Sequence, residues 1–98
     1  MVETLEDIRR VLQAHRQTLR ERYGIELIGL FGSWVRGEER PESDIDVLVA
    51  FTRPVSLLEL VAAELFLSDL LGKRVDLVPR GNLRPELSTQ ILNKTVPL

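Results

Sequence analysis

The chain has 98 residues, of which 44% are apolar and 29% are charged, and its formal net charge is -2. These values are typical of one small globular domain, and they exclude a disordered chain or a protein that attracts nucleic acid through a global basic field. Cysteine is absent, which excludes disulfides, thiol nucleophiles and cysteine-bound zinc.

The first predicted element is an amphipathic helix over about residues 5–22. Ile8 and Leu12 recur at helical spacing, Thr4 is a candidate N-cap, and Gly24 is expected to end the helix. The basic side chains of this helix are interpreted as a solvated face. A partner surface is the alternative for its five arginines, Arg9, Arg10, Arg16, Arg20 and Arg22. The only histidine, His15, is interpreted as solvated.

The remaining elements alternate between strands and helices, with a polar loop before the second strand. In chain order they are strand 25–31, short helix 33–39, loop 37–43, strand 45–51, helix 57–71, strand 74–79 and helix 85–93. The second strand lacks polar alternation and is expected to be covered on both faces, and the helix at 57–71 is expected to be buried. The order αβαβαβα predicts one domain over residues 1–98, with helices packed on a mixed sheet of about three or more strands.

Two aspartates mark the start of the second strand, at the end of the stretch GSWVRGEERPESDID. Side chains at positions i and i+2 of a strand point to the same face, so Asp44 and Asp46 are expected to lie side by side. Two carboxylates this close repel each other unless a cation lies between them. Oxygen ligands without a nearby histidine or cysteine favour Mg²⁺ or Mn²⁺ over zinc.

A glycine–serine pair stands ten residues earlier, at the end of the first strand. Gly32 allows the backbone to approach a phosphate closely, and Ser33 offers a hydroxyl and an amide at a helix N-terminus, where the dipole favours anions. Mg²⁺ usually bridges one or two carboxylates and substrate phosphates. The combined pattern predicts phosphoryl or nucleotidyl transfer, in which two metal ions about 3.5–4 Å apart could stabilise the attacking and leaving oxygens.

A third acid lies in the middle of the third strand, between a valine and a leucine. Burying an unpaired carboxylate is costly, so Asp76 needs a partner. Our prediction is a metal ion shared with Asp44 and Asp46. An ion pair with Arg74 or Arg53 is the alternative.

The spacing of these residues carries the argument. Asp-x-Asp alone also occurs in turns and helix caps, where aspartate only binds backbone amides. The full pattern is Gly-Ser, ten residues, then Asp-x-Asp. At roughly 6% usage per residue type, it is expected by chance in on the order of one chain in a thousand of this length.

These residues resemble the signature of the minimal nucleotidyltransferases of the DNA polymerase beta superfamily, in which a third acid follows on a later strand. The matching positions are Gly32, Ser33, Asp44, Asp46 and Asp76, together with the arginine–glycine pair Arg36–Gly37 and Ser43. The resemblance covers nearly the whole chain. Trp34 and Val35 depart from the small residues or tyrosine often found there. Trp34 is interpreted as packing on the sheet, with stacking near the nucleotide as the alternative.

The resemblance implies a two-layer α+β nucleotidyltransferase fold, ATP as substrate, and Mg²⁺, with two ions expected and Mn²⁺ possible. A hydroxyl attacks the α-phosphate, and diphosphate leaves. The implied roles are as follows: Asp44 and Asp46 hold the metal on the triphosphate, Asp76 joins them at the second metal, and Gly32, Ser33, Arg36 and Ser43 bind the nucleotide. Arg36 would neutralise the leaving diphosphate, with a surface salt bridge to Glu38 or Glu39 as the alternative.

Short members of the family are often antitoxins encoded beside a helical HEPN ribonuclease toxin, which they neutralise by adding AMP to a tyrosine. The resemblance therefore implies a cytoplasmic protein adenylyltransferase that forms a hetero-oligomer with its toxin. No apolar run reaches the roughly 20 residues of a membrane span, and the first residues do not resemble a signal peptide. Two alternatives stay open: steric masking of the toxin without catalysis, and transfer to a small molecule or an RNA end, although the net charge disfavours RNA.

Overall fold

The computed structural model describes residues 4–40, 43–82, 89–91 and 93–98. Its elements in chain order are α1 (Leu5–Ala14), α2 (Arg16–Thr18), the π-helical turn η1 (Leu19–Tyr23), β1 (Ile25–Phe31), α3 (Ser33–Arg36), β2 (Ile45–Phe51), α4 (Leu57–Leu71), β3 (Val75–Pro79), the 3₁₀ turn η2 (Arg80–Asn82) and β4 (Val96–Pro97). The strands form one sheet in the order β3-β2-β1-β4. β1 is antiparallel to β2 and β4, and β2 is parallel to β3, so the predicted mixed sheet of an α+β fold is confirmed.

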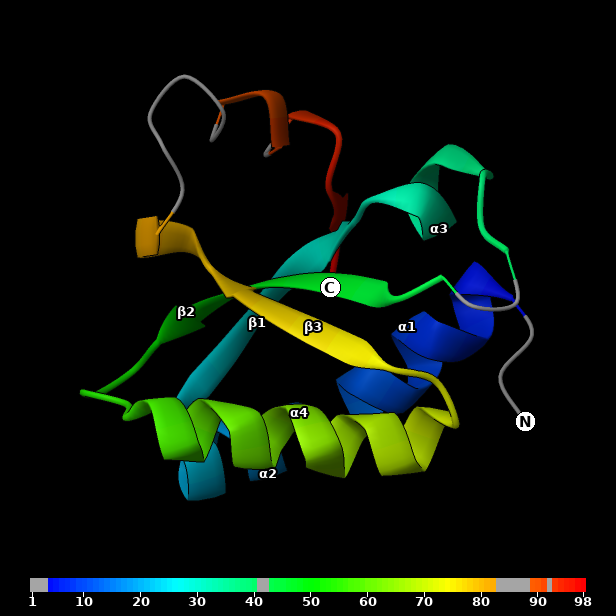
Figure 1. Cartoon of the computed structure of the whole chain (residues 1–98). Coiled ribbons are helices and arrows are strands. Elements are labelled where there is room, and N and C mark those ends of the chain that lie inside the picture. Colours follow the sequence, from blue (N-terminus) through cyan, green and yellow to red (C-terminus); the bar gives the residue numbers. More distant parts are fainter. Residues whose placement is uncertain (1–3, 41–42, 83–88, 92) are drawn as a thin grey trace.

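The helices α1 and α4 cover one face of this sheet, and α3 lies at the end where β1 finishes and β2 begins (Figure 1). The core lies between the helices and the sheet. Its fully buried members come from α1, η1, α4 and the two central strands: Ile8, Leu12, Leu19, Ile25, Ile45, Val47, Val49, Ala63 and Leu67. Burial of this apolar surface supplies the main driving force for folding.

The first helical segment begins as predicted but is not one helix. The Thr4 hydroxyl accepts a hydrogen bond from the Asp7 amide at 3.1 Å, and Gly24 ends the segment with φ 67°. The helix breaks at His15, whose ring nitrogen Nδ1 lies 2.8 Å from the Val11 carbonyl oxygen. The expectation of a solvated histidine was wrong, because the His15 side chain is half-buried and its ring packs edge-on against Phe66.

The helix α4 has the predicted bounds, but the expectation that it is buried was wrong. A capping box at Ser56 begins the helix and Gly72 ends it. Its inner face reaches the core, whereas Leu57 is 75% exposed and Leu58 is 82% exposed. Apolar residues surround the helix on all sides, so only one stripe can face the sheet. Within the part of the chain that the structure describes, no helix is both long and apolar enough to span a membrane.

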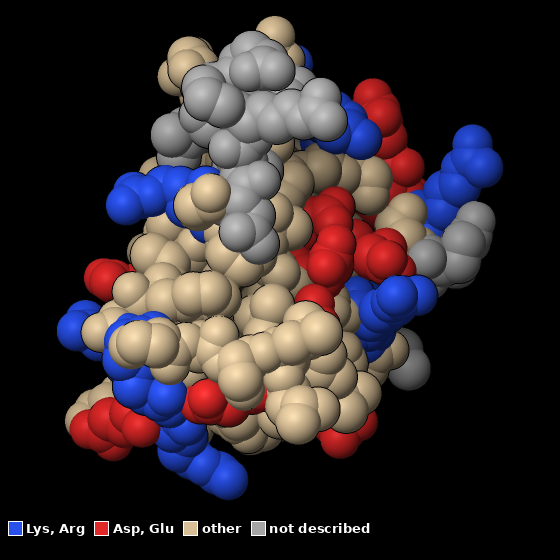
Figure 2. Space-filling model, turned by 60° about the vertical axis from the view of Figure 1, so that its left-hand side comes forward, with Lys and Arg blue, Asp and Glu red and all other residues tan. Residues whose placement is uncertain are grey.

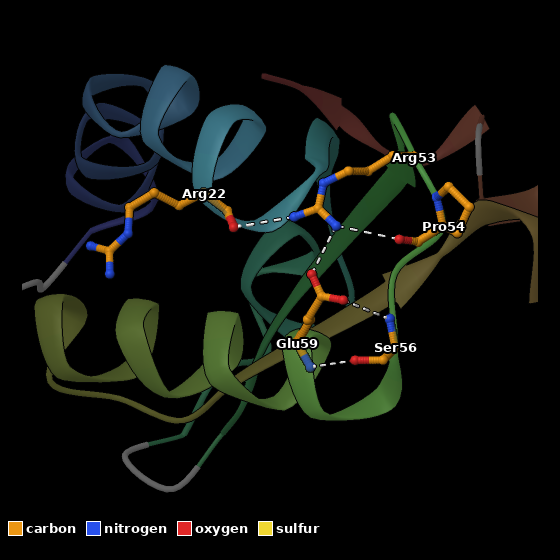
Figure 3. Close-up of polar contacts among 5 residues, drawn as sticks. All are labelled: Arg22, Arg53, Pro54, Ser56 and Glu59. Atoms are coloured by element: carbon orange, nitrogen blue, oxygen red, sulfur yellow. Dashed lines mark hydrogen bonds and ion pairs between the residues drawn. The ribbon is translucent and has the colours of Figure 1, made fainter.

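The strand β2 is buried on its helix-covered face and only partly covered on the other. Leu48 is buried on that second face, but Asp46 and Ala50 are partly exposed, so the expectation of complete cover on both faces was wrong. Just beyond β2, Arg53 joins the end of η1 to the start of α4 (Figure 3). It donates hydrogen bonds to the carbonyl oxygen of Arg22 at 3.3 Å and to the carboxylate of Glu59 at 2.8 Å.

The C-terminal segment returns to the sheet as β4, a short strand that the sequence pattern does not predict. Most of the predicted helix 85–93 lies outside the described residues, and of this stretch residues 89–91 and 93 are helical. β4 pairs with β1 at Gly29 and Leu30. A Cβ atom at position 29 would lie 2.7 Å from the Val96 carbonyl oxygen, so the small size of Gly29 lets the two strands approach.

Candidate active site

The parallel pairing of β2 with β3 brings two of the predicted acids together. Asp46 lies directly opposite Asp76 in the register, as Ile45 lies opposite Val75. The residues flanking both aspartates point into the core, so the two carboxylates project from the opposite face of the sheet. Asp44 precedes β2 by one residue and completes the group of three acids that the spacing predicts.

The three acids interact electrostatically. The pKa of Asp46 is raised, first by its partial burial and then by the negative charges of Asp76 and Asp44, while the positive charge of Arg36 lowers it. Figure 2 shows one face of the molecule on which acidic side chains gather in a hollow, with basic side chains beside them. Like charges held this close raise the free energy of the folded protein, and a bound cation would relieve that repulsion.

The two arginines considered as alternative partners of Asp76 bind other acids. Arg74 Nε lies 3.8 Å from Asp44 Oδ2, and Arg53 pairs with Glu59. The Arg74 side chain is 82% exposed, so its ion pair with Asp44 contributes little in water. Asp76 itself is exposed on β3, so its carboxylate is solvated, and the expectation that it is buried and needs a partner was wrong. A metal ion shared with Asp44 and Asp46 stays a prediction.

Two side chains of α4, not anticipated from the sequence, hold the backbone on either side of Asp76. Ser68 Oγ accepts a hydrogen bond from the Val75 amide at 2.9 Å, and Glu64 Oε2 accepts one from the Leu77 amide at 2.9 Å. β3 is an edge strand, so these two contacts satisfy amides that would otherwise be open. The pKa of Glu64 is raised by partial burial and by the charge of Asp76, whereas its hydrogen bond from Leu77 acts in the opposite direction.

Gly32 connects β1 to α3 beside Asp46. Its φ of 83° is a left-handed value, and a Cβ atom there would overlap Asp46 Oδ2 and lie 3.1 Å from Asp46 Cγ. Only glycine therefore lets this turn approach the Asp46 carboxylate without strain. Ser33 begins α3, but the helix has only four residues, so the expected dipole contribution is small and the backbone amides and the hydroxyl must attract an anion.

The other two predicted nucleotide-binding residues are Arg36, the last residue of α3, and Ser43, in the loop between α3 and β2. Arg36 Nε donates to Glu38 Oε2 at 3.2 Å, the salt bridge considered as an alternative, and both side chains are about half exposed or more. Ser43 Oγ accepts a hydrogen bond from the Arg40 amide at 2.8 Å. Ser43 therefore shapes the loop that leads into Asp44, while its hydroxyl hydrogen stays available to a ligand.

Trp34 packs in the core, as interpreted from the sequence. Its side chain is 7% exposed, and Lys73 Nζ lies 5.4 Å from the centre of its ring. The indole Nε1 is buried and has no hydrogen-bond partner within the described residues. Stacking on a nucleotide is excluded for a ring in this position.

The residues of the site fit a divalent cation. Among residues 4–40, 43–82, 89–91 and 93–98, no three acid or histidine side chains already form a metal cage. The donor set is nevertheless made of carboxylate oxygens, which suit Mg²⁺, and such ions usually complete their shell with water and substrate phosphates. Partial burial, followed by the negative charges of Asp76 and Asp44, raises the pKa of Asp46, and a cation bound there would favour its ionised form.

A family model described as a nucleotidyltransferase domain matches residues 12–98. The chain belongs to this nucleotidyltransferase family. The protein adenylyltransferase MntA of Thermococcus cleftensis is 46% identical over 93 residues, which cover 95% of this chain and 94% of that protein. This nucleotidyltransferase thus resembles, over nearly its full length, a relative that is named for transfer of AMP to protein.

Solved structures agree with the sequence comparison. A minimal nucleotidyltransferase has a TM-score of 0.81 at 41% identity, covering 98% of this chain and 97% of the other. A chain from a toxin–antitoxin crystal structure with AMP-PNP has the same fold, with a TM-score of 0.68 at 24% identity, and the match covers 90% of this chain and 68% of that one. The two-layer fold that the resemblance implies is therefore confirmed, and the nucleotidyltransferase class of enzyme is shown.

Proposed function

We propose that this nucleotidyltransferase is a Mg²⁺-dependent protein adenylyltransferase that moves AMP from ATP to a tyrosine of a HEPN ribonuclease toxin in the cytoplasm. The observation that carries this proposal is the register of β2 and β3, which sets Asp46 opposite Asp76 beside the Gly32 turn. The name of the relative from Thermococcus and the toxin–antitoxin crystal structure with the same fold support the acceptor and the partner.

The reaction assigns a separate task to each part of the site. The tyrosine oxygen forms a bond to the α-phosphorus, the bond from that phosphorus to the bridging oxygen breaks, and the diphosphate carries away the electron pair. Asp44 and Asp46 would hold Mg²⁺, which supplies charge neutralisation at the phosphates. A tyrosine hydroxyl has a pKa near 10, so Asp76 acting as base, or the metal ion, would help to remove its proton.

The decisive experiment compares the wild type with the double variant Asp44→Asn plus Asp46→Asn. Each protein is incubated with Mg²⁺, labelled ATP and the helical toxin encoded beside it. We expect the double variant to label the toxin more than about 100-fold more slowly, because both metal-holding carboxylates are lost. Glu21→Gln is a matched control, because Glu21 is exposed on η1 and lies outside the site.

The melting temperature separates a lost site from a lost fold. Asp46 is partly buried beside two other acids, so removing its charge removes a desolvation cost and a repulsion, and the metal-free double variant should melt no lower than the wild type. Label on the toxin at the wild-type rate in the double variant would refute the proposed site. Label that falls equally with Glu21→Gln would show that the effect is not specific.

Steric masking of the toxin is the second candidate, and the outer surface of α4 favours it. Leu57, Leu58 and Leu65 are all more than 60% exposed on this helix. Apolar side chains gathered in this way are typical of a surface that another protein covers. If the double aspartate variant protects cells from the toxin as well as the wild type does, masking suffices and transfer of AMP is dispensable.

A further inference from the structure

A pocket of about 180 Å³ lies between α3 and the C-terminal segment, next to Gly32. Besides Gly32, the pocket is lined by residues from the end of β1, from α3 and from the C-terminal segment: Phe31, Val35, Arg36, Gln90, Ile91 and Lys94. The sequence pattern assigns no role to the last three of these residues. Two cations therefore face one small hollow that borders the glycine turn of the proposed site.

The size and lining of the pocket favour a compact anion. Pockets that enclose a ligand of drug size usually measure about 300–1,000 Å³, so this one is too small for a whole nucleotide. The apolar side chains of Phe31, Val35 and Ile91 lower the local dielectric, which strengthens the attraction between Arg36 or Lys94 and a negative charge. One or two phosphate groups match both the volume and the charge.

Gly32 joins the pocket to the acids. It lines the pocket, and a Cβ atom at position 32 would overlap Asp46 Oδ2, so the pocket directly borders the acid that would hold the metal. A triphosphate whose α-phosphate lies at the acids can therefore extend past Gly32 and place its terminal phosphates in the pocket. The Arg36–Glu38 ion pair is exposed on both sides, so releasing Arg36 to a phosphate costs little.

The strand β4 fixes the backbone that carries Lys94. The Lys94 amide donates to the carbonyl oxygens of Gln90 and Ile91, both at 3.2 Å, and the Leu98 amide donates to the Ile28 carbonyl oxygen at 3.0 Å. These contacts on both sides of β4 hold Lys94 opposite α3. We propose that Lys94 is a positioning residue that, with Arg36, binds the terminal phosphate of ATP, so that the C-terminal segment selects a triphosphate donor. This inference rests on the proposed nucleotidyl transfer from ATP.

The test measures binding of inorganic tripolyphosphate and of AMP, each with Mg²⁺, by calorimetry. Lys94→Met should weaken tripolyphosphate binding about tenfold, the loss of one charge-assisted contact, and leave AMP binding unchanged. Lys94→Arg should restore most of the affinity. Arg10→Met is the control, because the Arg10 side chain is 73% exposed and pairs with Asp7 on α1.

Kinetics with the toxin supply the second readout. In Lys94→Met the KM for ATP should rise about tenfold with a smaller change in kcat, because the contact holds the donor and not the acceptor. Unchanged tripolyphosphate affinity in Lys94→Met, or an equal loss of AMP affinity, would overturn the inference while transfer by the wild type still stands. A different outcome is that Lys94→Met weakens tripolyphosphate binding while the wild type labels no protein. That result would refute the proposed function but support the phosphate site.

Discussion

The two ends of β2 satisfy their charges in opposite ways. At its start, Asp46 lies opposite Asp76 and near Asp44, and its pKa is raised. Beyond its end, Arg53 binds Glu59 and lowers the pKa of that carboxyl, with the hydrogen bond from the Ser56 backbone as the second cause (Figure 3). One strand thus carries an uncompensated group of acids at one end and a fully paired arginine at the other.

This difference separates function from stability within one small domain. Like charges raise the free energy of the folded protein unless a cation compensates them, which agrees with the proposed role of the start of β2 in holding a metal ion. Hydrogen bonds from Arg53 to three acceptors connect η1, the loop after β2 and α4, so the far end is arranged for folding. Changes at the start should alter activity, and changes beyond the end should alter the melting temperature.

The largest expected effect is on activity, from Gly32→Ala. The new Cβ would overlap Asp46 Oδ2, so the carboxylate must move away from the position that β2 gives it. We expect AMP transfer to fall about 100-fold, because misplacing a group by about 1 Å can cost that much. The measurement is the initial rate of toxin labelling with saturating ATP.

Gly37→Ala is the matched control for this prediction. Gly37 has a φ of 73°, close to the 83° of Gly32, but a Cβ atom at position 37 meets nothing within 4 Å. Gly32, with ψ -155°, has a conformation open essentially to glycine alone, whereas Gly37, with ψ 22°, is in the left-handed helical region. Gly32→Ala therefore carries the larger backbone strain, and Gly37→Ala shows what a substitution at positive φ does where no acid is disturbed. Equal losses of activity in the two variants would mean that strain, and not the contact with Asp46, explains the effect.

The next expected effect is on stability, from Arg53→Met. Methionine keeps much of the aliphatic stem but removes the donors to Arg22, Pro54 and Glu59. We expect the melting temperature to fall by a few degrees, while the rate of AMP transfer measured well below the melting temperature stays within about twofold. An activity loss as large as that of Gly32→Ala, with no change in melting temperature, would contradict the division between the two ends of β2.

Spacing along the sequence predicts which acids lie near each other on one strand. It does not predict contacts between segments that are distant in the sequence. Asp44, Asp46 and Gly32 follow from the two-residue period of a strand and from a short loop, so the sequence alone predicts their proximity. The contact of Asp76 with them required only that its strand pair beside β2. Glu64 and Ser68 were missed because their spacing of four residues is common on any helix, and only packing against the edge of β3 gives it meaning.

The remaining errors also come from tertiary contacts. The ring of His15, where the helix breaks, packs against Phe66 from α4, and β4 approaches β1 closely at Gly29. An isolated two-residue strand has too few apolar positions to show a period. The exposure of α4 could not be predicted because its apolar residues occupy every side, so the sequence does not reveal which stripe faces the sheet.

The smallest expected effect is a pH dependence of stability, from Glu59→Gln. The folded protein lowers the pKa of Glu59, chiefly through its hydrogen bond from Arg53, so the unfolded chain binds a proton more readily than the folded one. The stabilisation by Glu59 is therefore complete above the ordinary glutamate pKa of about 4.3, and it is lost as the pH falls through the lowered value in the folded state. Glutamine keeps an acceptor for the Ser56 amide but removes the charge.

We expect the variant to melt slightly lower than the wild type at neutral pH, with the difference closing as the pH falls through the lowered pKa of Glu59 in the folded state. The melting temperatures of both proteins, measured at several pH values in low salt, provide the check. Glu38→Gln is the matched comparison, because Glu38 also pairs with an exposed arginine but does not cap a helix. A difference that stays constant from neutral to acid pH would show that the end of β2 stabilises the fold by packing and neutral hydrogen bonds, without the charge of Glu59.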